Sequence, residues 1–119
     1  MKVLLVNGSS RANGCTGVAL KEVERALNEE GIETELVFIG NAPIADCTAC
    51  DFCIDNGRCV FDDIVNTFVD KARGADGFVF GSPVYYAHPS GRLLSFMDRV
   101  FYSGGDALRF KPAAAVLSA

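Results

Sequence analysis

Apolar residues follow two patterns along this chain, short unbroken runs and longer stretches with an apolar stripe. Unbroken runs rich in branched residues are typical of strands that are buried on both faces. Stripes with apolar residues three or four positions apart are typical of helices that cover a sheet. The predicted strands span residues 2–7, 34–39, 77–81 and 112–118. The predicted helices span residues 16–30, 62–74 and 89–102, the last stopped by Ser103-Gly104-Gly105.

Strands and helices alternate in this order, and that alternation predicts the α/β class. We expect a doubly wound parallel sheet in a three-layer α/β/α sandwich, joined by right-handed crossovers. In such sheets ligands bind outside the carboxyl ends of the strands, where the strand order reverses. The loops to examine are therefore residues 8–17, 40–61 and 82–90. The second follows neither period and is too long to be a mere connector, so we interpret it as an ordered, functional loop.

The length and net charge of the chain indicate how many domains it has and which kind of ligand it binds. The chain has 119 residues, which indicates a single domain over residues 1–119. Its formal net charge of −4 argues against nucleic acid as a partner, because phosphate contacts require a basic face. No apolar run is long enough to cross a membrane, and we interpret the first apolar run as a strand and not as a leader. We therefore expect a cytoplasmic protein with a small-molecule ligand.

The loop over residues 8–17 predicts an anion site at the start of the first helix. Ser9, Ser10 and Thr16 offer hydroxyls there, Arg11 offers a guanidinium, and the helix start offers free backbone N–H groups. The loop lacks the Gly-Lys-Ser/Thr ending of a Walker A motif and is not Gly-x-Gly-x-x-Gly. The structural alternative is a turn that only caps the helix.

The loop after the third predicted strand is aromatic and rigid. It reads Gly-Ser-Pro-Val-Tyr-Tyr-Ala-His-Pro over residues 81–89 and leaves the sheet at the same edge as the first loop. Backbone groups of residues 84–86 could bond the polar rim of a flat ring while an aromatic side chain packs nearby. The alternative is that Tyr85 and Tyr86 only cover the end of the sheet.

These motifs, in this order, resemble those of the NAD(P)H-dependent FMN reductases, and within them the iron–sulfur flavoproteins. The likeness rests on Gly-Ser-x-Arg-x-x-Gly-x-Thr at residues 8–16, Ser-Pro-Val-Tyr at residues 82–85 and Asp98-Arg99. It implies a flavodoxin-like fold in which the first loop holds the FMN phosphate and the second holds the ring. The implied cofactor-binding residues are Ser9, Ser10, Arg11, Gly14, Cys15, Thr16, Pro83, Val84, Tyr85 and Tyr86.

Two departures from the family pattern stand out. Relatives often carry asparagine before the threonine, where this chain has Cys15, so one phosphate donor is lost. We expect Cys15 to be a small packed side chain. Relatives also usually continue past the fourth strand, so we expect this domain to be truncated after that strand.

Five cysteines are present, and four of them fall within residues 47–59. Four thiolates on one loop suit an iron–sulfur cluster or a tetrahedral zinc ion, and the third alternative is a set of free thiols. The spacing of Cys47, Cys50, Cys53 and Cys59 resembles that of the compact motif with which iron–sulfur flavoproteins hold a [4Fe–4S] cluster.

No residue is predicted to act as a catalytic acid or base. His88 is the single histidine, and we interpret it as structural or solvated, because hydride transfer to a flavin requires orientation more than a protein base. We interpret Asp98 and Arg99 as a pair on the helix surface or at a subunit interface.

The resemblance implies an FMN oxidoreductase that takes hydride from NADH or NADPH at flavin N5 and passes electrons to a second acceptor. It also implies a homo-oligomer. The main alternative is an electron carrier without turnover, like flavodoxin or an iron–sulfur flavoprotein. A third is a regulatory module whose cysteine loop senses metal or redox state.

Overall fold

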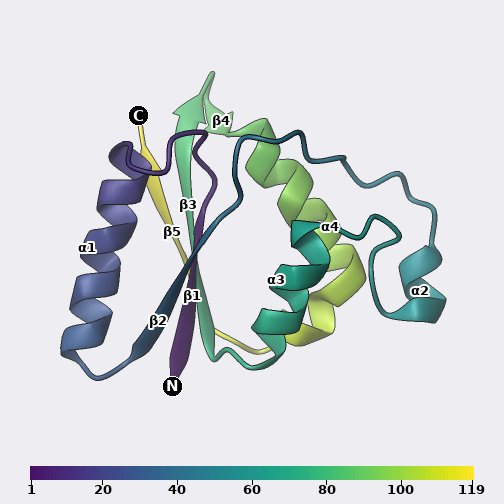
Figure 1. The fold of residues 1–119 in the computed structure, drawn as a ribbon, viewed down its shortest axis with the longest axis horizontal. Coiled ribbons are helices and arrows are strands. Elements are labelled where there is room, and N and C mark those ends of the chain that lie inside the picture. The colour runs from purple at the N-terminus through teal and green to yellow at the C-terminus, as the bar shows by residue number, and fades with distance from the viewer.

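The computed structural model describes residues 1–119 and contains one parallel sheet with helices on both faces (Figure 1). Four parallel strands lie side by side in the order β2-β1-β3-β5. Their bounds are Lys2–Asn7 for β1, Glu33–Phe38 for β2, Gly77–Tyr85 for β3 and Ala113–Ser118 for β5. A two-residue strand, β4 (His88–Pro89), pairs antiparallel with the end of β3. The predicted fold class is confirmed.

The four helices cover the two faces unequally. They are α1 (Cys15–Glu29), α2 (Phe52–Asn56), α3 (Ile64–Arg73) and α4 (Gly91–Leu108). Helix α1 lies alone on one face, while α3 and α4 lie together on the other and α2 stands at the outer end of the long loop (Figure 1). The strand order reverses between β1 and β3, so their carboxyl ends form the switch point at which such sheets bind ligands.

Strand β1 lies at the centre of the fold because its side chains supply both cores. Leu4 and Val6 are fully buried in the larger core, toward α3 and α4, while Leu5 is fully buried in the smaller core under α1. This alternation follows from the period of two along a strand. The apolar run of β1 is continuous because side chains on both faces of the strand are buried, as the sequence predicted.

Helix α4 is longer than predicted. The Ser-Gly-Gly sequence was expected to end it, but the helix continues to Leu108 with a kink at Gly104 (φ −143°). A Cβ atom on Gly104 would lie 2.4 Å from Cγ1 of Val69, so this glycine permits α3 and α4 to approach closely. The glycine that predicted a helix end is therefore a packing contact.

Other boundaries differ in smaller ways. Strand β3 runs on to Tyr85, and the short helix α2 lies inside the segment predicted to be loop. On α4, Phe96 is buried, whereas Leu94 and Phe101 are 39% and 48% exposed. The predicted starts of the helices hold well, since Asp63 and Ser90 cap α3 and α4 with their side chains.

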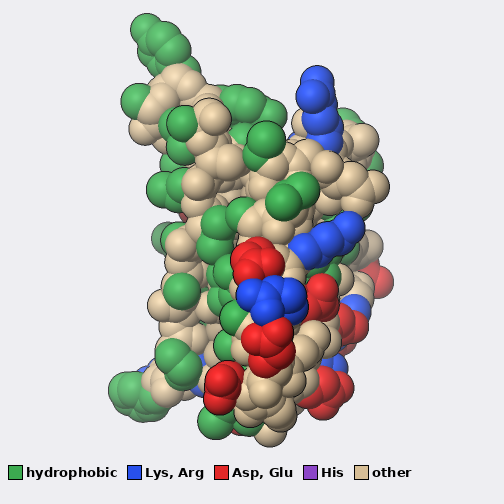
Figure 2. Space-filling view, turned by 90° about the vertical axis from the view of Figure 1, so that its left-hand side faces the viewer, with side chains coloured by type: hydrophobic (Ala, Val, Ile, Leu, Met, Phe, Trp, Pro, Cys, Tyr) green, Lys and Arg blue, Asp and Glu red, His purple; other side chains and the backbone are tan.

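The surface over α1 carries charges of both signs. Figure 2 looks at this side of the molecule, and acidic and basic side chains alternate down it. Arg25 forms ion pairs with Glu22 and Glu29 on the exposed face of the helix. This face therefore offers no continuous basic surface. No helix in the structure combines the length and the apolarity that crossing a bilayer requires.

Candidate functional site

An open pocket of about 410 Å³ lies at the carboxyl ends of β1, β3 and β5. This size is within the range of pockets that take cofactors and drug-sized ligands. The lining residues are Ser9, Ser10, Arg11, Gly14, Cys15, Thr16, Pro83, Val84, Tyr85, Ser118 and Ala119. The structure thus brings together every residue predicted for the cofactor except Tyr86.

Backbone contacts hold the first loop on the sheet. The N–H of Gly8 donates to the carbonyl of Gly81 at 2.8 Å, which joins the two loops directly. The buried Asn7 accepts from the N–H of Ser9 and donates to the carbonyl of Ala12. A Cβ atom on Gly17 would lie 2.2 Å from that Ala12 carbonyl oxygen, so the loop can fold back on α1 only over glycine.

The first turn of α1 is open to an anion. Gly14 is its N-cap, and no side chain caps the helix there. The N–H groups of the first turn therefore point toward the pocket edge without a protein acceptor, and the helix dipole favours negative charge at this end. Arg11 is exposed beside this turn, and its guanidinium forms no ion pair or hydrogen bond within the chain.

Thr16 has a structural contact in addition to its place in the pocket lining. Its Oγ1 lies 2.9 Å from Oγ of Ser118, and its side chain is buried. This contact ties the start of α1 to the end of β5. Ser118 was not predicted as a site residue, although its position at the carboxyl end of a parallel strand was the signal that could have found it.

The second loop is fixed at its base and strained at its tip. Ser90 donates its N–H to Oγ of Ser82 and its hydroxyl to the carbonyl of Gly8 at 2.7 Å, so the two loops share an anchor. At the tip, Tyr86 and Ala87 both have positive φ, 48° and 70°. This turn directs the Tyr86 side chain away from the pocket, where it is 99% exposed.

Two other interpretations of the loops are settled by exposure. Cys15 was expected to be packed, but it is exposed at the rim of the pocket, because the first residue of α1 faces outward there. His88 was expected to be structural or solvated, and it is exposed on β4.

The four clustered cysteines meet at a second place, beside α4. Cys47, Cys50, Cys53 and Cys59 line one hollow of about 30 Å³, and all four are free thiols. No group of three or more ligating side chains is close enough to share one metal ion. A zinc ion requires all of its sulfurs about 2.3 Å from one centre, and the four thiols are not gathered around one such position in this structure.

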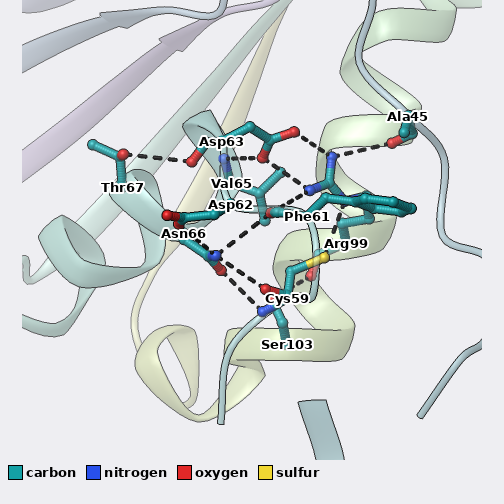
Figure 3. A network of polar contacts seen from close by, with 10 residues as sticks. All are labelled: Ala45, Cys59, Phe61, Asp62, Asp63, Val65, Asn66, Thr67, Arg99 and Ser103. Atoms are coloured by element: carbon teal, nitrogen blue, oxygen red, sulfur yellow. Dashed lines mark hydrogen bonds and ion pairs between the residues drawn. The ribbon is translucent and has the colours of Figure 1, made fainter. Parts of the chain in front are cut away.

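Arg99 lies against this hollow and corrects a prediction. It was expected with Asp98 on the helix surface or at a subunit interface, but it is 1% exposed within the chain itself. Its Nη1 and Nη2 each donate to the Asp63 carboxylate at 2.8 Å, and its Nε donates to Sγ of Cys59 at 3.2 Å (Figure 3). The signal was present in the sequence, since residue 99 continues the stripe formed by Phe96 and Ser103.

Burial by itself would lower the pKa of Arg99. The hydrogen bonds to Asp63 and then Cys59 outweigh that cost, so the pKa of Arg99 is raised and the guanidinium stays charged. Its ring neighbour is Phe61, whose centroid lies 5.1 Å from the guanidinium carbon. The charge is therefore held between a carboxylate, a sulfur and an aromatic face.

Asn66, on α3, fixes the same segment from the other side. It accepts from the N–H of Cys59 at 2.9 Å and donates to the carbonyl of Cys59 at 3.1 Å. It also donates to the Asp62 carboxylate, and this hydrogen bond, together with the contact from Arg58, lowers the pKa of Asp62. The stretch from Cys59 to Asp63 is thus held by side chains from two helices (Figure 3).

Residues 1–119, the whole chain, match the model of the family described as NADPH-dependent FMN reductase. The chain belongs to this family. The resemblance drawn from the loops is thereby confirmed, and family membership supports FMN as the cofactor. That the individual pocket residues bind FMN stays a prediction.

Similar proteins extend this result. An iron–sulfur flavoprotein of Methanocaldococcus jannaschii is 38% identical over 99 residues, covering 83% of this chain and 51% of that protein. One from Methanosarcina thermophila is 37% identical over 100 residues, covering 83% of this chain and 52% of that protein. The chain therefore spans about half the length of the curated relatives that it matches.

Solved structures share the fold. RosB with a bound 8-demethyl-8-formylriboflavin-5′-phosphate intermediate superposes with a TM-score of 0.75 at 19% identity, covering 98% of this chain and 51% of that one. The flavoenzyme NAD(P)H:acceptor oxidoreductase FerB of Paracoccus denitrificans superposes with a TM-score of 0.74 at 22% identity, covering 99% and 60%. At these identities the likeness supports the fold alone.

Proposed function

We propose that this chain forms the FMN-binding part of an NAD(P)H-dependent flavin oxidoreductase. The observation that carries the proposal is the meeting of two loops, one with an uncapped helix start and one with an aromatic rim, around one pocket at the switch point of the sheet. Such a pocket suits a flat ring that carries a phosphate. RosB, which shares the fold, is solved with a flavin phosphate bound.

One end of the pocket would bind the phosphate of FMN, and the other end would bind its ring. The N–H groups of the first turn of α1, the hydroxyl of Ser10 and the free guanidinium of Arg11 would hold the phosphate. The backbone of residues 83–85 and the ring of Tyr85 would hold the isoalloxazine. Bound FMN would supply hydride acceptance from reduced nicotinamide and onward electron transfer. No side chain of the pocket is required to move a proton.

Flavin titration tests this proposal on the full chain. FMN fluorescence should fall on addition of protein, and riboflavin, which lacks the phosphate, should bind more weakly. Unchanged FMN fluorescence at high micromolar protein would refute the proposal. Steady-state oxidation of NADPH with a quinone separates the enzyme from the electron carrier, because a carrier should show almost no turnover.

We further propose that the cysteine site holds an iron–sulfur cluster as a second redox centre. The four free thiols around one hollow supply the donor set, and the two archaeal relatives above are named iron–sulfur flavoproteins. Absence of a shared ion position does not oppose this, since a [4Fe–4S] cluster takes one cysteine at each iron. The hollow of about 30 Å³ is smaller than a cluster, so the loop must open outward to admit one.

The loop is built to allow that opening. Every hydrogen bond between residues 46 and 56 is local, within the turn of α2, and none ties these residues to the body of the fold. Anaerobic purification followed by iron and sulfide analysis tests the proposal. About four irons and four sulfides per chain are expected. A colourless protein with intact thiols, or one with a single zinc, would refute it.

A further inference from the structure

The four cysteines are held very unequally. Cys47, Cys50 and Cys53 lie on the segment whose hydrogen bonds are all local. Cys59 is fixed at three points, since Asn66 binds its N–H and its carbonyl while Arg99 donates to its Sγ. One ligand position is therefore set by the fold before any metal is present, and the other three can adjust around it.

The donor to Cys59 is itself held in place by its remaining contacts. A guanidinium has five N–H groups. Nη1 of Arg99 donates to Ala45 O at 3.2 Å and to Asp63, and Nη2 donates to Phe61 O at 3.0 Å and to Asp63. Four donors are thus used by oxygens of the surrounding loop, and the fifth, on Nε, points at sulfur (Figure 3). Rotation of the guanidinium would break several of these bonds together.

We propose that Arg99 is the positioning residue of the cysteine site: it makes Cys59 the fixed ligand and, through its N–H···S bond, raises the reduction potential of the cluster. This rests on the cluster proposed above. Reduction adds one negative charge to the cluster, so a cationic N–H donor on a ligand sulfur stabilises the reduced form more than the oxidised form. A purely structural arginine would leave the potential unchanged.

The test compares Arg99→Lys with Arg58→Lys in the full chain, reconstituted anaerobically. Arg99→Lys keeps the positive charge beside Asp63, but a lysine ammonium cannot donate to Cys59 and form the paired Nη bonds to Asp63 in the geometry of a guanidinium. Arg58 precedes Cys59 in sequence yet pairs with Asp62 in solvent, so its replacement is the matched control. At a fixed poise the reduced-to-oxidised ratio should fall about tenfold in Arg99→Lys, a shift of about 59 mV for one electron. Arg58→Lys should leave the ratio unchanged.

A second measurement needs no variant. Labelling the arginine nitrogens of the native chain should produce a nitrogen coupling to the reduced cluster in pulsed electron paramagnetic resonance, and lysine labelling should produce none. An unchanged potential in a folded, cluster-loaded Arg99→Lys protein would overturn the proposal, as would the absence of the arginine coupling. Failure to load any iron would overturn the cluster with it, while leaving FMN binding intact.

Discussion

The two candidate sites of this chain are built in opposite ways. The pocket at the end of the sheet is held by backbone groups and short polar side chains, such as Gly8 on Gly81 and Ser90 on Gly8. The cysteine site is held at one end only, by the side chains of Arg99 and Asn66. The first is therefore a consequence of the fold, and the second depends on a few side chains placed on helices.

This difference determines how each site should respond to change. A pocket formed by strand ends keeps its shape as long as the sheet forms. Adding atoms to its closely packed loops should therefore be the change that distorts it. An irregular loop that is fixed by one buried guanidinium should lose its conformation when that guanidinium is removed, even though the sheet stays folded. The predictions below separate these two outcomes.

The largest effect is expected from Arg99→Met. It removes one partner of a buried ion pair and orphans the carbonyls that Arg99 binds, so stability should fall by about 3 kcal/mol. The value lies at the low end for such losses because Asp63 keeps access to water. Urea unfolding measures it, with Arg58→Met as the control at an exposed pair. Equal losses in the two variants would contradict the assignment.

Gly17→Ala should damage the other site. A Cβ atom there would collide with the Ala12 carbonyl, so the first loop must shift, at a cost of about 2 kcal/mol. FMN affinity, measured by fluorescence titration, should fall more than tenfold. Gly105→Ala is the control, because a Cβ atom on that helical glycine meets nothing within 4 Å. Unchanged affinity in Gly17→Ala would show that the loop does not bind the flavin.

The same contrast explains what could be predicted from the sequence. The strands, their parallel order and the pocket follow from local patterns plus one topological rule, which is why residues 8–17 and the segment after Gly81 were expected at one edge of the sheet, where the structure brings them together. The predicted end of the third strand at Gly81 was wrong, because β3 runs on to Tyr85. The predicted stop at Ser103-Gly104-Gly105 is confirmed only as a break in the helical backbone at Gly104, after which the helix resumes to Leu108. Tyr86 lies outside the pocket lining because the turn at Tyr86 and Ala87 has positive φ at both residues, a conformation that neither residue type predicts.

The cysteine site could be predicted only as a list of ligands. Spacing gave the four thiols, but the buried arginine that fixes Cys59 is 40 residues away in the sequence. An arginine beside an aspartate on a helix indicates a solvated pair in most proteins, and only the helical spacing of residue 99 from Phe96 opposed that interpretation. Side-chain networks of this kind are set by tertiary packing.

A smaller effect is expected from Arg11→Ala, which removes a charged side chain from the phosphate end of the pocket. Because Arg11 is exposed, the lost interaction should be screened, and FMN affinity should fall about fivefold, or about 1 kcal/mol. Riboflavin binding should stay the same, since it has no phosphate. Equal losses for both flavins would place Arg11 at the ring instead, and a change in stability would give it a structural role.

The smallest effect concerns an ion cluster remote from both sites, which gives the baseline for the comparison. Lys71 on α3 lies 2.9 Å from Glu35 on β2, and it holds the pKa of that carboxyl below its usual value of 4.5, with a further contribution from Lys2. A carboxyl whose pKa is depressed on folding contributes stability above its unfolded pKa, and that contribution is lost as pH falls through the folded pKa. Glu35→Gln should therefore lower stability by less than about 1 kcal/mol at pH 7 and make it fall less steeply below about pH 4.5.

Urea unfolding between neutral and acid pH measures this, with Glu30→Gln as the control because Glu30 is exposed and forms no ion pair. Parallel pH profiles for the native chain and Glu35→Gln would show that the pair between α3 and β2 adds nothing to folding, whereas loss of FMN or iron in Glu35→Gln would show that the two sites are less independent than their construction indicates.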